Sequence, residues 1–257
     1  MWQYVVQVLS VLRLIAGGHP EESVMRVAKV SALILSAVVA LSLVSSVQAG
    51  PVSLYFNPYL EASDSPIVAT GMSYFYLEDF EDFALNTPGV TASAGYSTKP
   101  AWPAAATDSV DGDDGSVDGF GNNGNSWFSM DGGTGITFTF DAGVLGGLPT
   151  HVGIVWTDGI NPVTFEAFDA YGVFRGSITA FAIADGVYTG TTAEDHFFGI
   201  SEPDGIGKIL IRSGAGGGIE VDHLQYGGTI PIPAPAGVVL AGLGAGLVGW
   251  LRRRRAL

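Results

Sequence analysis

Cysteine is absent from this 257-residue chain, and basic residues are scarce. The lack of cysteine excludes disulfides, thiolate metal sites and thiol catalysis, so the fold must be stabilised by packing, hydrogen bonds or bound ions. Between residues 50 and 234 only four basic residues face 23 acidic ones, which gives this segment a charge of about −19. A body this acidic is expected to repel nucleic acid and anionic lipid surfaces and to attract cations.

The same segment also lacks a convincing amphipathic helix. Short runs of alternating or β-branched residues recur between clusters of Gly, Asp and Asn, and they predict strands at 72–77, 135–140, 152–157, 163–168, 171–178, 197–200, 208–211 and 219–226. Residues 136–140 and 163–168 alternate with a period of two, as expected for strands with one buried face. Asp169 to Gly172 is predicted to form a hairpin turn. The sequence therefore predicts an all-β fold, an antiparallel β-sandwich or jelly roll, over residues 50–229.

The N-terminal region is typical of a secretory signal peptide. Arg26 and Lys29 precede an apolar run at 30–43, and a small-residue exit ends at Ala49. This order predicts a signal peptide over 25–49 that is cleaved after Ala49. Met25 is then the expected start, and residues 1–24 are a mis-assigned upstream extension. The alternative is that Met1 to Leu14 forms an additional amphipathic segment.

The C-terminal tail, residues 230–257, has three parts in a fixed order. A Pro233-Ala234-Pro235 element comes first, an apolar run at 236–251 follows, and Arg252, Arg253, Arg254 and Arg255 come last. The apolar run, extended back to Pro231, has about the 20 residues that a transmembrane helix needs. The arginine cluster is expected to stay in the cytoplasm, which leaves the body on the outside.

This three-part tail resembles the PEP-CTERM sorting signal of exosortase substrates. The resemblance implies export by the secretion machinery, anchoring in the inner membrane, cleavage by an exosortase-type membrane protease, and a final place at the cell surface or in the extracellular matrix. Ala234 departs from the family pattern, which usually has Glu between the two prolines. The alternative is an ordinary single-pass anchor with a stop-transfer cluster.

Three segments of the body resemble galactose-binding-like jelly-roll modules. They are the opening segment 77–83, the strand at 205–211 and the closing segment 219–227. In such modules the last strand runs beside the first. The resemblance implies a fold and does not imply a ligand.

A Gly-punctuated acidic stretch is the candidate metal site. It contains Asp108, Asp111, Asp113, Asp114 and Asp118, followed by three asparagines. Ca²⁺ prefers six to eight oxygen ligands, and such a loop can supply several. The spacing does not match the EF-hand pattern. Two interpretations stay open, a structural Ca²⁺ site and a solvated loop without a bound ion.

Other candidate sites are weaker. His151, His196 and His223 lack the spacing of a zinc site, so isolated strand-end histidines are expected. Glu220 and Asp222 place two acids on one strand face, as a glycosidase would need, but the compact acidic signature of the sandwich glycanases is absent. Trp102, in a proline-containing loop, is the candidate for stacking on a sugar ring.

These observations favour an exported, non-enzymatic surface protein with a structural or adhesive role. A carbohydrate-binding module that recognises polysaccharide is the main alternative. A secreted β-sandwich hydrolase that uses Glu220 and Asp222 is the further alternative.

Overall fold

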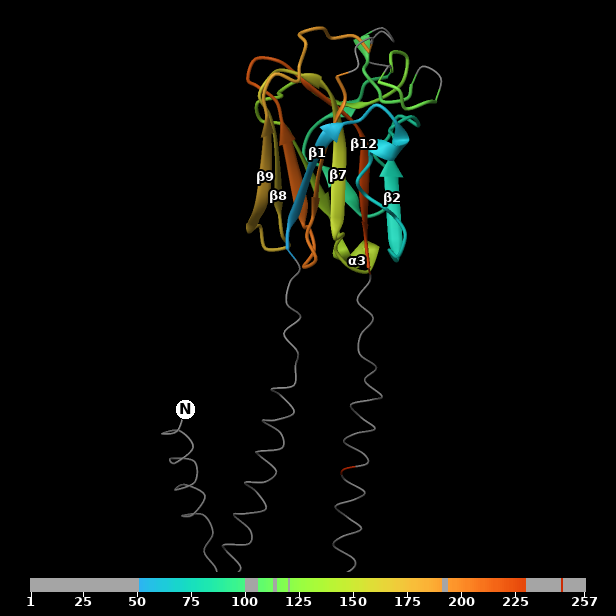
Figure 1. The fold of residues 1–257 in the computed structure, drawn as a ribbon, viewed down its shortest axis with the longest axis vertical. Helices are drawn as coiled ribbons and strands as arrows, with labels where there is room; N and C mark the ends of the chain where they lie inside the picture. Colours follow the sequence, from blue (N-terminus) through green and yellow to red (C-terminus); the bar gives the residue numbers. More distant parts are fainter. Residues whose placement is uncertain are drawn as a thin grey trace, which may run out of the picture. The chain divides into compact units, whose positions relative to one another are not determined.

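The computed structural model describes residues 51–99, 106–112, 115–119, 121–190 and 194–229, together with Gly246. Over these residues the predicted antiparallel all-β architecture is confirmed (Figure 1). No helix within them is long and apolar enough to cross a membrane. The predicted signal peptide, the sorting motif, Trp102, Asp113 and Asp114 lie outside the described residues, as does the apolar run at 236–251 apart from Gly246.

Two sheets make up the described body. Its elements are β1 (Ser53–Pro58), η1 (Ala62–Asp64), β2 (Tyr74–Glu78), β3 (Val90–Ala92), β4 (Tyr96–Ser97), β5 (Trp127–Ser129), β6 (Ile136–Phe140), α3 (Ala142–Leu145), β7 (His151–Gly159), β8 (Val163–Phe168), β9 (Phe174–Ala180), β10 (His196–Ser201), β11 (Lys208–Arg212) and β12 (Ile219–Gly228). The larger sheet has the order β1-β10-β7-β12-β5-β4, and β2 also pairs with β12. The smaller sheet has the order β3-β6-β11-β8-β9.

The core lies between the two sheets. Side chains alternate between buried and partly exposed along β8, which is the period-two pattern of its sequence. The inner faces contribute large fully buried residues such as Trp156, Phe165 and Tyr226 to one hydrophobic cluster. Burial of such side chains from both sheets is the main force that holds the sandwich together.

β12 is buried along its whole length, so its outer face is covered as well. A second hydrophobic cluster lies there, formed by Tyr59, Ile67, Val110, Val155 and Phe197. Segments after β1 and before β5 therefore pack on the outside of the larger sheet. Polar residues of β12 that point outward are consequently enclosed rather than solvated.

A β-bulge interrupts β12. Its register against β7 shifts between Asp222 and Gln225, and His223 has a φ of +43°. Asp222 pairs with Val155 of the outer cluster, whereas Leu224 belongs to the inner core. The bulge inserts one extra residue, His223, between the outward and inward positions.

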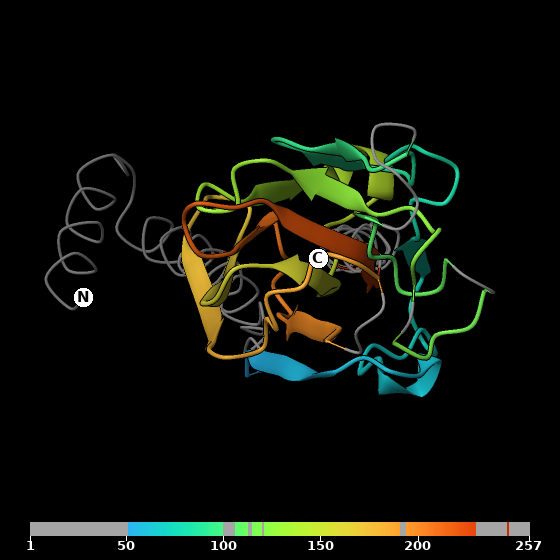
Figure 2. The ribbon, with the colours of Figure 1, turned by 90° about the horizontal axis from the view of Figure 1, so that it is seen from above.

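Both ends of the described body lie at the same end of the sandwich. Ser53 pairs with Ser201, Ser201 with His151, and His151 with Gly227, so the start of β1 and the end of β12 share one row across the sheet. Loops gather at the opposite end, which is uppermost in Figure 1 and is viewed from above in Figure 2. This opposite end, where β12 begins, is called the loop end below.

The eight predicted strands are all present; β8 has the predicted bounds, and the other seven have shifted ends. β9 starts at Phe174 rather than at residue 171, because the Asp169 to Gly172 turn extends further than expected. In that turn, the Asp169 carboxylate accepts the backbone N–H groups of Tyr171 and Val173, and Gly172 has a φ of +77°. Four strands were not predicted: β1, β3, β4 and β5.

The closing strand β12 lies beside the expected opening segment, because Leu224 and Gln225 pair with Glu78 and Leu77 of β2. β1, which precedes β2, pairs with β10 at the edge of the sheet instead. β2 ends at Glu78, inside the segment 77–83 that was expected to open the fold. The additional edge strand β1 therefore precedes the expected opening segment.

Candidate metal centre

The outward-facing acids of β12 hold a long loop at the loop end. The Glu220 carboxylate accepts the backbone N–H of Asp108 at 2.9 Å and the Ser126 hydroxyl. The Asp222 carboxylate accepts the backbone N–H groups of Val110 at 2.8 Å and His223 at 2.6 Å. Glu220 and Asp222 do share one face of the strand, as predicted, and both bind the segment 108–110.

Two further carboxylates are buried beside Glu220 without partners. Neither oxygen of Asp108 and neither oxygen of Asp195 forms a hydrogen bond within the described part of the chain, and both side chains are almost fully buried. Burial, followed by the charges of Asp195 and Glu220, raises the pKa of Asp108 to about 10. Burial and the neighbouring charge of Asp222 likewise hold the pKa of Asp195 well above its ordinary value. Unpaired buried carboxylates of this kind are costly unless they are protonated or bind a cation.

The acidic character extends to the surrounding strands. Burial raises the pKa of Glu220 to about 8, of Asp222 to about 7 and of Asp158 to about 6. Asp158 lies directly opposite Glu220 in the β7–β12 pairing. Glu194, whose pKa burial raises to about 7, precedes Asp195. The loop end thus concentrates acidic side chains whose pKa values are raised by burial and by one another's charges.

Asp222 also belongs to a second group of side chains, which combines carboxylates with an imidazole. One ligand atom from each of Asp111, Asp222 and His223 lies within 4.8 Å of the others. His223 Nε2 is 3.5 Å from Asp111 Oδ2 but makes no hydrogen bond, and its side chain is only 4 % exposed. Interaction with His223 lowers the pKa of Asp111. Burial alone would lower the pKa of His223, but the Asp111 carboxylate and the Asp222 charge raise it above its ordinary value.

A chain of polar contacts supports the other side of the His223 ring. The Tyr59 hydroxyl lies 3.4 Å from His223 Nδ1, and Gln225 Nε2 donates to the same hydroxyl at 3.3 Å. Ser65 Oγ donates to Gln225 Oε1 at 2.6 Å. These contacts hold the ring on the side of Nδ1, while Nε2 faces Asp111.

Of the predicted calcium residues that the structure describes, Asp108 and Asp111 are not gathered around one point. Asp108 faces the group with Asp195 and Glu220, whereas Asp111 faces His223. Asp118 is exposed on the loop. The loop is therefore anchored by backbone N–H groups on β12, and its carboxylates separate toward different partners.

Of the three histidines, only His223 differs from the prediction of isolated surface or strand-end residues, because His151 and His196 each begin a strand. His223 is not an isolated strand-end residue, because it lies within β12 and is buried next to two carboxylates. His151 begins β7 at the opposite end, where its ring contacts the hydroxyls of Thr150 and Ser201. His196 begins β10, and its Nδ1 lies 2.6 Å from the backbone carbonyl oxygen of Glu194. Only His223 belongs to a group that could hold a metal within the described residues.

A pocket of about 530 Å³ opens at the loop end. Its lining includes Phe128, Asp158, Tyr188 and Glu220. The Tyr188 side chain is 74 % exposed, so its ring is accessible for stacking. Trp102, the residue predicted to stack on a sugar ring, lies outside the described residues, so that prediction stays open.

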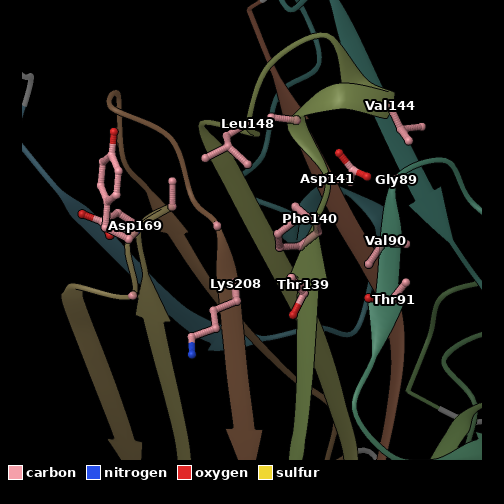
Figure 3. A pocket seen from close by; sticks show the side chains of 15 residues that line it. Gly89, Val90, Thr91, Thr139, Phe140, Asp141, Val144, Leu148, Asp169 and Lys208 are labelled. Atoms are coloured by element: carbon pink, nitrogen blue, oxygen red, sulfur yellow. Dashed lines mark hydrogen bonds between the residues drawn. The ribbon is translucent and has the colours of Figure 1, made fainter.

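A second hollow, of about 910 Å³, lies beside α3 and β11 (Figure 3). Its three charged side chains are already engaged. Asp141 accepts the N–H of Gly143 at the start of α3, Asp169 accepts N–H groups of its own turn, and Lys208 Nζ lies 4.8 Å from the centroid of the Phe168 ring. The charged side chains of this hollow therefore have structural roles, and the hollow is not a candidate site.

Sequence reasoning missed Asp158, Glu194 and Asp195. Asp158 lies near the end of β7, and Glu194 and Asp195 lie just before β10. The pairing of β10 with β7 and of β7 with β12 brings them to the end of the sheet where β12 binds the 108–110 segment. Comparisons with protein-family models, with curated proteins and with solved structures find no match to this chain. The site must be interpreted from its own geometry.

Proposed function

We propose that this chain is an exported surface protein with a structural or adhesive role and no enzymatic activity. One observation supports this proposal, namely that β1 begins and β12 ends at the same end of the sandwich. A tail that continues from β12 into a membrane anchor would hold the body by that end. The loop end, with its acidic residues and its aromatic pocket, would then face away from the membrane.

Cysteine labelling can test export, because the chain has no native cysteine. Tyr188→Cys places a thiol at the loop end, and Tyr171→Cys places one in the β8–β9 turn, where Tyr171 is 92 % exposed. Both variants should react with a membrane-impermeant maleimide on intact producing cells. Tethering near the end of β12 should also make a bulky polymer maleimide react faster at position 188 than at position 171.

Reaction only after the cells are broken would contradict export. Intact mass of the surface and medium fractions provides a second measurement. A species that starts at Gly50 and ends near Pro233 to Pro235 supports signal-peptide cleavage and exosortase-type processing. Retention of Arg252 to Arg255 supports a permanent anchor instead.

Polysaccharide binding is a second candidate, and the pocket that contains Tyr188 and Phe128 favours it. Aromatic rings stack on the apolar faces of sugars, and Asp158 in the same pocket can accept hydrogen bonds from sugar hydroxyls. Tyr188→Ala should then abolish polysaccharide binding measured by calorimetry, whereas Tyr171→Ala should leave it unchanged. Equal binding by both variants would remove this candidate.

The hydrolase alternative receives less support. Asp222 is completely buried, and both of its oxygens accept backbone N–H groups. A catalytic carboxylate must approach the bond that it cleaves. Glu220 lines the pocket, but one of its oxygens holds Asp108 and Ser126.

A further inference from the structure

We propose that Asp111, Asp222 and His223 form a binding site for a divalent transition-metal ion of the zinc type. One ligand atom of each residue lies within 4.8 Å of the others, so a single ion can contact all three. An imidazole with two carboxylates suits zinc and related ions, whereas calcium prefers oxygen ligands alone. This site is independent of the proposed surface role and of the pocket near Tyr188.

The first argument is the buried ring nitrogen of His223, which has the Asp111 carboxylate nearby but no hydrogen bond among the described residues. His223 Nε2 faces Asp111 Oδ2 at 3.5 Å. Asp111 Oδ1 is also buried without a hydrogen-bond partner among the described residues. A metal ion between these groups would satisfy both atoms and compensate the two negative charges.

The backbone of β12 is the second argument. The left-handed conformation of His223 is uncommon for a residue other than Gly, Asn or Asp. The bulge lets His223 join Asp222 near the same point, although consecutive strand residues normally face opposite ways. Strained residues and bulges concentrate at functional sites.

The surroundings of His223 supply the third argument. Ligand histidines usually have a hydrogen-bonding partner on the ring nitrogen that does not bind the metal. Tyr59 provides this contact at Nδ1, and Gln225 fixes Tyr59. Asp111 is 22 % exposed, so the site is open to solvent on one side and can accept a water molecule as a further ligand.

The test uses the purified full chain, stripped with a chelator and free of any histidine tag. Elemental analysis after dialysis against Zn²⁺ should give about one zinc per chain. Calorimetry should show that His223→Gln and Asp111→Asn each weaken Zn²⁺ binding by at least about tenfold. Tyr59→Phe, which removes only a positioning contact, should weaken it less than either ligand variant.

His151→Gln is the matched control, because His151 lies on the same sheet at the opposite end and contacts hydroxyls alone. Its Zn²⁺ affinity should equal that of the unmodified protein. Circular dichroism establishes that each variant is folded, and Asp111→Asn, on the loop, tests the site if His223→Gln fails to fold.

Two results would overturn the proposal. One is a folded, stripped protein that binds no Zn²⁺, which would leave Asp111 and His223 as a buried ion pair only. The other is zinc binding of equal affinity in His223→Gln and in the unmodified protein, which would place the ion on the surrounding carboxylates. Replacing Zn²⁺ with Co²⁺ provides a spectroscopic check, because the spectrum of bound Co²⁺ should show the loss of a nitrogen ligand in His223→Gln.

Discussion

Asp222 and His223 are consecutive residues of β12, yet ligand atoms of both lie within 4.8 Å of a carboxylate oxygen of Asp111. A regular strand would direct the two side chains to opposite faces. The bulge between Asp222 and Gln225, with a φ of +43° at His223, replaces that alternation. The geometry of the candidate site therefore depends on the backbone at one position.

The backbone at His223 predicts an unusual order of variant stability. His223→Gly and His223→Val both remove the imidazole, but only valine is disfavoured at a positive φ. Although valine buries more apolar surface, we expect the Val variant to be less stable by about 1–2 kcal/mol. Urea unfolding of the metal-free variants measures this difference. At Gln225, which is not a positive-φ position, the Gly variant should instead be the less stable of the pair.

Glu78 is predicted to be a major structural carboxylate. It is buried at the end of β2, and it accepts the backbone N–H groups of Phe80 at 3.2 Å, Asn86 at 2.9 Å and Thr87 at 2.9 Å. Glu78→Ala leaves three donors without this partner, so the free energy of unfolding should fall by about 3 kcal/mol or more. Chemical denaturation measures the loss. Exposed Asp79, which accepts only the N–H of Glu81, is the control, and Asp79→Ala should cost less than about 1 kcal/mol.

The sequence predicts the sheets better than it predicts the site. Strands with clear alternation, such as β8, were located correctly because one buried face is enough to produce the pattern. β3, β4 and β5 have two or three residues each and lack a measurable period. β1 is an edge strand whose side chains are mostly exposed, so burial imposes little pattern on it.

The candidate site depends on contacts between residues far apart in the chain. Asp108 and Val110 bind acids that lie 112 residues later. The sequence shows the acidic loop and the Glu220-x-Asp222 spacing, but the register that joins them comes from the completed sheet. The bulge at His223 has no glycine to mark it. The acidic composition therefore predicts that the body attracts cations, whereas the sheet topology determines which acidic residues come together.

The substitution Asp195→Asn should affect the stability of the protein differently with and without calcium. The two buried oxygens of Asp195 lack partners within the described residues, so Asp195→Asn should leave the calcium-free protein as stable as before, or more stable. If calcium binds between Asp108 and Asp195, an excess of about 100 times the dissociation constant should stabilise the unmodified protein by about 2.7 kcal/mol. The Asn variant should lose most of this gain. Thermal unfolding in EGTA and in Ca²⁺ measures both effects, and an equal response of the two proteins would exclude calcium at Asp195.

Buried tyrosines predict a loss of stability at high pH. Burial raises the pKa of Tyr226 from 10.0 to about 12, and its hydroxyl donates to Pro88 O at 2.7 Å. Because the folded protein holds this proton more tightly than the unfolded chain, the resulting stability is complete below pH 10 and is lost as the pH rises through 12.

Tyr226→Phe should lower stability at pH 7 by about 1 kcal/mol, since it removes the hydrogen bond. It should also reduce the alkaline loss at pH 12 by up to about 2 kcal/mol, because phenylalanine has no proton to release. Urea unfolding at pH 7 and pH 12 separates the two effects, and exposed Tyr171→Phe is the control that should change neither. An alkaline loss of the same size in Tyr226→Phe would assign it to other groups, of which Tyr59 and Tyr74, each with a pKa of about 12, would be tested next.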